Sequence, residues 1–314
     1  MPRPLRAGVI GAGVFGGHHA RKYASLPGVK LAAVLDPHEE RAEALAGPAG
    51  AAVFDDLDAF LDAVDLVVVA SPASSHARLA LAALAKGRHV YVEKPLANDA
   101  EEARALVAAS EVSGAVLACG HQERAVFRAI GLLNLPERPT RIEAVRRGTF
   151  TGRNTDVSCV LDLMIHDIDL ALTLADGAPI EVSANGRITE GPLADEARAE
   201  LVFKGGMTAR LEASRIAGKR ERTMRIEFPS GALEIDFLAR KFVDRTPFGL
   251  DPNFAESADG RDPLGASVSA FVAAVRGRAS RPLVTGEEAS RALDVALEVD
   301  RRAVARTKLR LVRG

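Results

Sequence analysis

Three glycines near the start of the chain, Gly11, Gly13 and Gly16, constrain its fold more than any other feature. They follow an apolar segment, Ala7–Ile10, that is predicted to be a strand, and they open a pattern typical of a helix. In such a turn the first glycine permits the sharp bend, the second lets the backbone approach a pyrophosphate, and the third lets helix and strand pack closely. The pyrophosphate would meet free backbone N–H groups at the positive end of the helix dipole. The segment therefore predicts a dinucleotide-binding unit, and a glycine-rich turn without a cofactor is the alternative.

An acidic residue supports this interpretation. Asp36 closes the second predicted strand, twenty residues after Gly16. Its carboxylate can accept hydrogen bonds from a ribose diol and would repel a 2′-phosphate. We therefore expect NAD as the cofactor, in preference to NADP.

The first 120 residues alternate short apolar runs with alanine-rich helical patterns, which predicts a parallel sheet with crossover helices. The run "LVVVA", Leu66–Ala70, is continuously apolar, as expected for a strand covered on both faces. Asn98 and Glu101 have the spacing of a helix N-cap and its reciprocal partner. The other strands of this part are predicted at Ala7–Ile10, Lys30–Leu35, His89–Val92 and Ala115–Cys119. The helices are predicted at Gly16–Ser25, Glu39–Ala46, Ser74–Ala85 and Asp99–Ser113.

From about Arg141 the pattern changes to strands in which apolar and polar residues alternate, which is typical of a sheet with one wet face. Thr285 and Glu288 have capping-box spacing at the start of a late helix. We therefore predict an α/β fold with two domains, residues 1–120 and residues 121–314, whose last helix could pack back on the first domain. The later elements are predicted at Thr208–Ser214, Thr223–Phe228, Ala232–Phe237, Leu264–Arg276 and Glu287–Ala305, with Arg240–Arg261 irregular.

Composition excludes several classes of protein. The chain has 314 residues, of which 47% are hydrophobic, and a formal net charge of −1, which gives no general attraction to nucleic acid or to an anionic membrane. Its two cysteines, Cys119 and Cys159, offer no zinc-ligand spacing and suit a reducing compartment. We expect no signal peptide, no membrane span and no metal, and a cytoplasmic location.

A second signal lies at the predicted carboxyl edge of the parallel sheet, where open α/β sheets bind ligands. Ser71 and Pro72 follow one predicted strand, His76 begins the next helix, and Glu93 and Lys94 follow another strand. A lone lysine is most commonly solvated at the surface. Held between a strand end and a proline, however, the Lys94 ammonium could bind a substrate hydroxyl and stabilise developing alkoxide charge.

A third signal is the spacing of Asp162 and His166, four residues apart and therefore on one helical face. The pair could be an N-terminal cap with a buried structural histidine, two metal ligands, or an ordinary exposed pair. Catalysis is a further interpretation, because histidine is a natural proton acceptor when an alcohol loses a hydride and a carboxylate can orient it.

Taken together, these motifs resemble the Gfo/Idh/MocA family of NAD(P)-dependent sugar and cyclitol dehydrogenases, across nearly the whole chain. The resemblance implies an N-terminal Rossmann domain, with a doubly wound parallel sheet, and a C-terminal α/β domain. The latter's open, mostly antiparallel sheet would serve contacts in a homodimer or homotetramer. It also implies that Lys94 and His166 are the catalytic pair, and that Asp162 binds substrate and orients the imidazole. The loop "GHQER", Gly120–Arg124, would line the cofactor. The cofactor-binding residues that the resemblance implies are Gly11, Gly13, Val14, Phe15, Gly16, Asp36, Ser71, Pro72, His76, Glu93, Lys94, Gln122 and Arg124.

One branch of the family is similar in several longer stretches, among them "GHQER" and "LEASRIAGKRERTMRIEFPSG": the UDP-N-acetylglucosamine 3-dehydrogenases. These oxidise the sugar 3-hydroxyl before an aminotransferase installs nitrogen, on the way to a diamino sugar of lipid A. A diphosphate calls for arginine forks, and Lys204 to Arg225 holds seven Lys/Arg against two Glu, with Arg146, Arg147 and Arg153 earlier in the chain. Solvated sheet faces often carry such charges too.

The resemblance therefore implies hydride transfer from a sugar hydroxyl carbon to NAD, with Lys94, Arg153, Asp162 and His166 at the substrate. Many family members carry paired glycines where this chain has Thr155-Asp156-Val157-Ser158, so the substrate loop is specific to a subfamily. The alternatives are a dehydrogenase of a free sugar or inositol, a Rossmann-type reductase of a bilin or imine, and a non-enzymatic NAD sensor. A reductase or a sensor would not need the trio of Lys94, Asp162 and His166.

Overall fold

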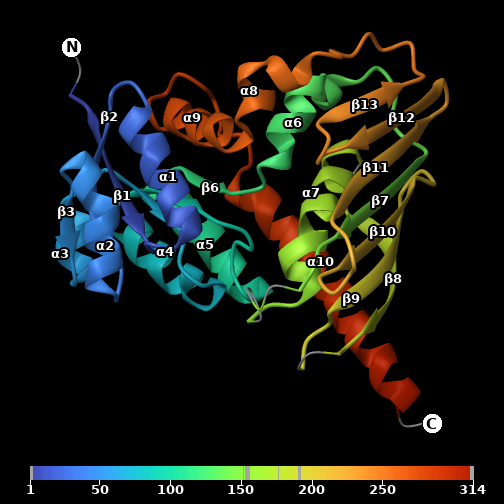
Figure 1. Ribbon diagram of the computed structural model, residues 1–314, viewed down its shortest axis with the longest axis horizontal. Coiled ribbons are helices and arrows are strands. Elements are labelled where there is room, and N and C mark those ends of the chain that lie inside the picture. The colour runs from blue at the N-terminus through green and yellow to red at the C-terminus, as the bar shows by residue number, and fades with distance from the viewer. Residues whose placement is uncertain (1–2, 151, 153–155, 176, 190–191, 312–314) are drawn as a thin grey trace. The chain divides into compact units, whose positions relative to one another are not determined.

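The computed structural model describes residues 3–150, 152, 156–175, 177–189 and 192–311 (Figure 1). The chain divides into two compact units, and each is described by itself below. The first unit comprises Met1–Gln122 and Leu264–Ser290, and the second comprises Glu123–Pro263 and Arg291–Gly314. Among the described residues, no helix combines the length and the apolar composition needed to span a bilayer.

The first unit is built on a six-stranded sheet in which every neighbouring pair of strands is parallel. The strand order is β3-β2-β1-β4-β5-β6, which confirms the predicted doubly wound sheet. Because the order reverses between β1 and β4, the carboxyl ends of these two strands border the crevice where such sheets bind ligands. The strands are β1 (Leu5–Ile10), β2 (Val29–Leu35), β3 (Ala52–Phe54), β4 (Leu66–Val69), β5 (His89–Val92) and β6 (Leu117–Cys119).

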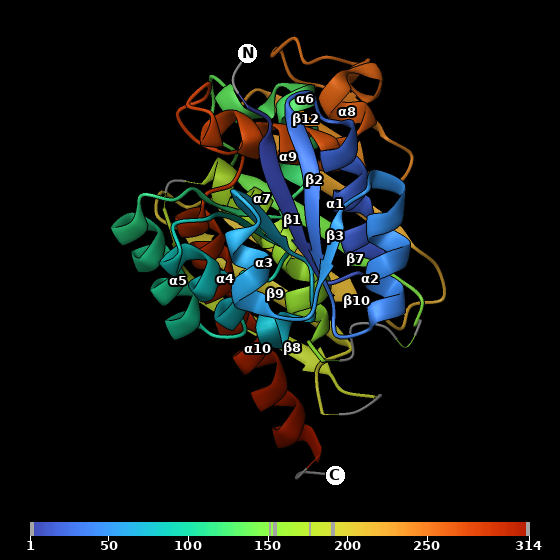
Figure 2. The same ribbon diagram turned by 90° about the vertical axis from the view of Figure 1, so that its left-hand side faces the viewer.

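Helices cover both faces of this sheet, with α1 and α2 on one side and α4 and α5 on the other (Figure 2). Helix α5 is capped one residue later than predicted: Asp99 accepts a hydrogen bond from Glu102 N, and Glu102 in turn accepts one from Asn98 N. The carboxylate of Asp99 thus takes the place predicted for Asn98. The helices are α1 (Val14–Ser25), α2 (Glu39–Ala46), α3 (Leu57–Asp62), α4 (His76–Ala85), α5 (Ala100–Ser113) and α9 (Pro263–Val275), with short 3₁₀ turns at Gly47–Ala49 and Ala73–Ser75.

Helix α9, which the sequence analysis grouped with the second domain, packs on the first sheet. The Tyr91 hydroxyl lies 2.9 Å from Ser267 Oγ, and the Tyr91 ring meets Phe271 edge-on at a centroid distance of 5.7 Å. Val268 and Phe271 join one buried cluster with residues of β1 and α1. A helix from the C-terminal part of the chain therefore completes the hydrophobic core of the first unit.

The second unit contains a seven-stranded sheet in the order β13-β12-β11-β7-β10-β9-β8. Of its neighbouring pairs, only β7 and β10 are parallel, so the predicted mostly antiparallel sheet is confirmed. The strands are β7 (Arg141–Arg147), β8 (Pro179–Arg187), β9 (Glu196–Phe203), β10 (Thr208–Ser214), β11 (Glu221–Phe228), β12 (Gly231–Asp236) and β13 (Lys241–Asp244).

Side chains alternate strictly between the two faces of this sheet, as the period of a strand requires. Along β7, Ile142, Ala144 and Arg146 are buried on the inner face, which α7 and the turn before it cover, while their neighbours face outward. The segment predicted to be irregular contains β13 and α8. The helices of this unit are α6 (Glu123–Ile130), α7 (Ile165–Leu174), α8 (Ala258–Arg261) and most of α10 (Gly286–Leu311), with a π turn at Val160–Met164 and 3₁₀ turns at Leu132–Asn134 and Phe254–Glu256.

The capping box predicted for the last helix, α10, is present at its start. Thr285 N donates to Glu288 Oε2 at 3.0 Å, and Glu288 N donates to Thr285 Oγ1 at 3.2 Å. These reciprocal bonds satisfy N–H groups that a helix leaves without intrahelical partners.

Candidate active site

The glycine turn after β1 has the geometry that dinucleotide binding needs. Gly11 has φ +98°, and a Cβ there would lie 2.7 Å from the backbone nitrogen of Ser71 at the end of β4. A Cβ on Gly16 would lie 1.8 Å from the Gly11 carbonyl oxygen, so helix α1 and the turn pack too closely for any other residue. Around Gly13, in contrast, no described atom outside its two chain neighbours comes within 4 Å of the Cβ position. The first and third glycines thus shape the turn, and the second leaves its backbone open to a ligand.

Asp36 ties the end of β2 to this turn. Its Oδ2 accepts a hydrogen bond from Ala12 N at 2.6 Å, and its Oδ1 accepts one from His38 N at 2.8 Å. Burial alone would raise the pKa of Asp36, but these two N–H groups and the His38 ring hold it below the usual range. The carboxylate is therefore ionised beside the turn, where it has acceptor capacity left for a ribose diol.

A buried polar network lies beneath the residues that follow β5. Glu93 Oε1 lies 2.7 Å from His19 Nε2, and both side chains are almost fully buried. Gly120 leaves room for that carboxylate, since a Cβ there would lie 2.7 Å from Glu93 Oε2. Both ring nitrogens of His76 face backbone carbonyls, Pro95 O at 2.8 Å and Ser71 O at 2.9 Å. The contacts of His76 with two backbone carbonyls and of Glu93 with His19 therefore hold the chain in place around the half-buried Lys94.

The structure brings most of the predicted cofactor residues to the carboxyl edge of the first sheet. They follow β1, β2, β4, β5 and β6, and Val14 and Phe15 are exposed there. Their contacts with a cofactor stay predictions. Arg124 differs from the rest, because it belongs to the second unit and its buried guanidinium pairs with Asp169 through Nε at 2.9 Å and Nη2 at 2.7 Å.

In the second unit, His166 lies at the end of a chain of charged side chains. Its Nδ1 is 3.0 Å from Glu123 Oε2, and Glu123 Oε1 accepts a hydrogen bond from Arg146 Nη1 at 2.8 Å. The Arg146 guanidinium also donates to Asp167, from Nε at 3.0 Å and from Nη2 at 2.9 Å. The Arg146 guanidinium lies 5.9 Å from the Phe237 ring centroid. Arginine, glutamate and histidine thus form one connected network on the inner face of the sheet.

Glu123 is the member of this network that the sequence analysis missed. It lies within "GHQER", a stretch assigned as a whole to the cofactor, so its place at the imidazole was not foreseen. Burial alone would raise the pKa of Glu123, but the charges of His166 and Arg146 hold it well below the usual range. Burial would likewise lower the pKa of Arg146, whereas Asp167 and Glu123 raise it. The ion pairs therefore stay charged inside the unit.

Asp162 lies in a π turn, Val160–Met164, directly before α7. Such turns carry an extra residue per helical turn and are frequent at functional sites. Asp162 and His166 are thus held on one short helical segment, as predicted, although part of it is wider than an α-helix. Arg153, predicted to bind substrate, lies outside the described residues. Lys94 belongs to the first unit, so its meeting with His166 stays a prediction.

The arginines of the basic segment Lys204–Arg225 differ in whether they have an acidic partner. Arg210 pairs with Glu200 at 3.0 Å and Arg215 with Asp195 at 2.7 Å. Arg222 is the cross-strand neighbour of Arg146 and is largely buried, yet no hydrogen bond or ion pair links its side chain to the described residues. Burial and the charge of Arg146 lower its pKa. Two adjacent guanidiniums, one of them unpaired, favour an anion between or beside them.

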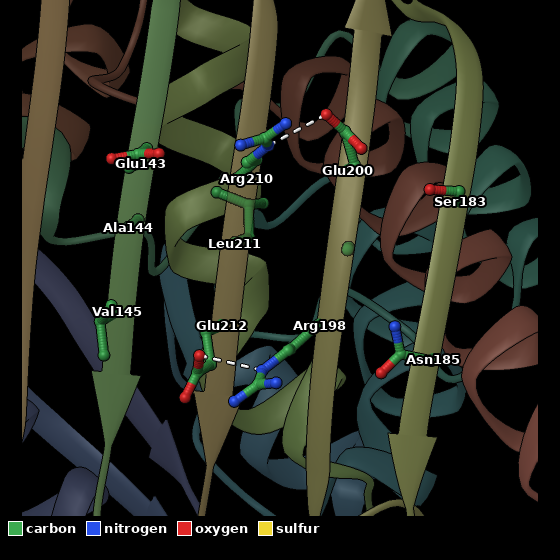
Figure 3. Close-up of a pocket in the computed structure, with 11 residues that line it drawn as sticks. Glu143, Ala144, Val145, Ser183, Asn185, Arg198, Glu200, Arg210, Leu211 and Glu212 are labelled. Atoms are coloured by element: carbon green, nitrogen blue, oxygen red, sulfur yellow. Dashed lines mark hydrogen bonds and ion pairs between the residues drawn. The ribbon is translucent and has the colours of Figure 1, made fainter.

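The outer face of the same sheet carries ion pairs of another character. Figure 3 shows Arg210 beside Glu200 and Arg198 beside Glu212, each pair spanning two neighbouring strands. They line a shallow depression of about 400 Å³ over β7 to β10. Because Arg198 and Arg210, the described arginines that line this depression, each pair with a carboxylate, neither is free to bind a substrate.

Comparison with known proteins agrees with both halves of this description. A family described as an oxidoreductase family with an NAD-binding Rossmann fold matches residues 5–121, and the Gfo/Idh/MocA C-terminal domain matches residues 137–234. The UDP-N-acetylglucosamine 3-dehydrogenase of Acidithiobacillus ferrooxidans is 36% identical over 305 residues, which cover 94% of this chain and 96% of the relative.

Two further comparisons extend this result. A solved structure of the Acidithiobacillus ferrooxidans enzyme has a TM-score of 0.87 at 33% identity, covering 96% of this chain and 98% of the other. The inositol 2-dehydrogenase of Rubrobacter xylanophilus is 32% identical over an alignment that covers 68% of this chain and 66% of the relative. The chain belongs to the Gfo/Idh/MocA family of NAD-binding oxidoreductases.

Proposed function

We propose that the protein oxidises a secondary hydroxyl of a nucleotide sugar with NAD, and that the substrate is UDP-N-acetylglucosamine, oxidised at its 3-hydroxyl. Similarity to the enzyme of that name over 94% of the chain supports this substrate. The observation that carries the proposal is Arg222, a largely buried guanidinium without an ion-pair partner among the described residues, close to the network of His166.

The residues of the first unit fit the cofactor. Gly13 leaves open space for a pyrophosphate at the start of α1, and the ionised Asp36 suits the ribose diol of NAD and disfavours a 2′-phosphate. When bound, NAD supplies an acceptor for the hydride that leaves the hydroxyl-bearing carbon. The other predicted cofactor residues at this sheet edge are proposed to line its nicotinamide and phosphates.

The chain's own residues handle the proton and the orientation of the substrate. We assign His166 as the base that takes the hydroxyl proton while the C–H electron pair departs, so that alcohol becomes ketone and imidazole becomes imidazolium. Lys94 donates a hydrogen bond to the same oxygen and stabilises its developing negative charge. Asp162 binds the sugar beside them, and Arg153 is proposed to contact it as well.

Arg222 distinguishes a nucleotide sugar from an inositol. An inositol carries no charge, so a buried unpaired guanidinium would only cost desolvation in its presence. The diphosphate of a UDP-sugar satisfies that guanidinium with charge-assisted hydrogen bonds. Oxidation of free sugars or inositols by this chain is the alternative function, favoured by its inositol dehydrogenase relatives.

The test is a panel of nucleotide sugars, free sugars and inositols, followed by NADH absorbance. We expect turnover with UDP-N-acetylglucosamine, and the Arg222→Met variant should raise its KM about tenfold or more, as for loss of a hydrogen bond between charged groups. Arg210→Met, which removes a paired arginine from the outer face, is the matched control and should leave KM unchanged. A response confined to inositols or free sugars would refute the substrate assignment.

The ketone product points to the next reaction. A 3-keto sugar is the substrate form that an aminotransferase requires, so we propose such an enzyme as the functional partner, on the way to a diamino sugar of lipid A. We further propose a homodimer or homotetramer that forms through the second sheet.

A further inference from the structure

The imidazole of His166 has a carboxylate neighbour from another helix. Glu123 begins α6, and its Oε2 lies 3.0 Å from His166 Nδ1. Both side chains are mostly buried, each 14% exposed. The resemblance to the family assigns the orientation of His166 to Asp162, and it places Glu123 only in a loop that lines the cofactor.

We propose that Glu123 is the positioning residue of the catalytic base: it holds the proton of His166 on Nδ1 and thereby presents the lone pair of Nε2 to the substrate hydroxyl. The inference rests on the proposed function only in taking His166 as the base. Asp162 then keeps the substrate-binding role.

The position of Glu123 is itself fixed by further side chains. Its second oxygen, Oε1, accepts a hydrogen bond from Arg146, and Arg146 is clamped by a bidentate pair with Asp167. Asp167 directly follows His166 in the chain, so the network closes on α7 itself. With Oε1 engaged by Arg146, the oxygen left for the imidazole is Oε2.

Charge explains why the carboxylate acts as an acceptor. Burial by itself would protonate Glu123, but the neighbouring His166 and Arg146, with Arg222 as a weaker contribution, hold its pKa well below the usual range. An ionised carboxylate has no proton to donate, so a hydrogen bond between it and the ring requires the hydrogen of His166 on Nδ1. The 3.0 Å separation is short enough for that bond, although Nδ1 does not meet hydrogen-bond geometry in this structure. A neutral ring with Nδ1 protonated has its free electron pair on Nε2, which is the form that a general base needs.

The same contact stabilises the product of proton transfer. After His166 takes the hydroxyl proton, the ring is an imidazolium, and a carboxylate 3.0 Å away favours that cation. Among the described residues of this unit, the charged groups that act on Glu123 beside the ring are Arg146 from β7 and Arg222 from β11, while Asp162 and Asp167 belong to the segment that carries His166. Arg146 is balanced by Asp167 and Glu123, so removal of Glu123 would leave less negative charge near the imidazolium and Arg146.

Nitrogen NMR of the imidazole tests the inference without any substrate. In the wild-type chain, with His166→Asn used to assign the ring, we expect the neutral form to carry its proton on Nδ1. A ring protonated on Nε2 would overturn the proposal, whatever the variants do.

Kinetics of Glu123→Gln provide the second measurement. The amide keeps the shape of the side chain and removes its charge, so kcat should fall about tenfold or more while the KM for NAD is unchanged. The acidic limb of the pH–rate profile should move to lower pH, because the carboxylate no longer favours the protonated ring. Glu123→Asp keeps the negative charge and should recover part of the rate.

The control is Glu200→Gln, which removes a carboxylate from the outer face and should alter neither kcat nor the profile. A Glu123→Gln variant with the wild-type tautomer and an unmoved acidic limb would refute the positioning role, even if its stability were lower. Failure of the wild-type chain to oxidise UDP-sugars would refute the substrate assignment instead, and leave the NMR result standing.

Discussion

Arg146 and Arg147 are consecutive residues of β7, yet they lie in opposite environments. The side chain of Arg146 is 1% exposed and pairs with Asp167 and Glu123 on the inner face of the sheet. The side chain of Arg147 is 32% exposed and pairs with Glu212 and Glu221 on the outer face. Both arginines form ion pairs, and the two sets of pairs differ in how deeply they are buried.

The difference shows that charged residues on one strand can have two roles, according to the face of the sheet on which they lie. On the outer face the pairs are solvated, and each contributes little to stability. On the inner face a pair that lost one member would leave a buried charge uncompensated, and the network reaches the imidazole of His166. The alternation of the strand therefore separates residues that organise a site from residues that keep a surface polar.

The largest expected effect concerns these two arginines directly. Arg146→Met should lower the free energy of unfolding by about 3–5 kcal/mol, because it leaves the carboxylates of Asp167 and Glu123 buried without their partner. Arg147→Met should cost about 1 kcal/mol or less. Urea denaturation of both variants measures the difference, and equal losses would contradict the contrast between the faces.

The next effect concerns chemistry more than folding. His166→Asn and Lys94→Met should each lower kcat about a hundredfold or more, by analogy with the removal of a preorganised hydrogen-bond donor. NAD binding, followed by fluorescence, should persist, since neither variant alters the glycine turn. Near-normal turnover in either variant would show that the roles are assigned to the wrong residues.

The smallest effect is a pH dependence that should differ between the faces. Because the folded-state pKa of Glu123 is depressed, its ionisation stabilises the fold above the unfolded pKa of about 4.3, and this contribution is lost as pH falls below that value. The loss of stability in Glu123→Gln should therefore be greatest near neutral pH and shrink in acid. Glu212→Gln, on the outer face, should show a much smaller change over the same range.

Much of the fold follows from local patterns. The strands β1, β2, β4 and β5 are marked by apolar runs, and the exposed three-residue edge strand Ala52–Phe54 is not, because it buries too little to show a period. The place of α9 could not be predicted, since its packing against Tyr91 joins residues far apart in the chain. Tertiary contacts of that range leave no mark on local periodicity.

The candidate site shows the same limit. Gly11, Gly16 and Asp36 act within one βαβ unit, so their spacing alone predicts their roles. The partner of His166 comes from another helix, and the sequence offers instead a carboxylate four residues away. Spacing reveals which residues share an element, whereas it does not reveal which elements meet.

The π turn at Val160–Met164 has a consequence for variation in chain length. A wide turn of this kind amounts to one residue inserted into an α-helix, and removing it would rotate everything before the turn by about 100° relative to α7. Asp162 lies within the turn itself and would stay three or four residues from His166, on the same side of the helix, whereas the residues before the turn would face another side. A single-codon deletion in this segment would therefore keep Asp162 near His166 and redirect the chain that leads into the helix.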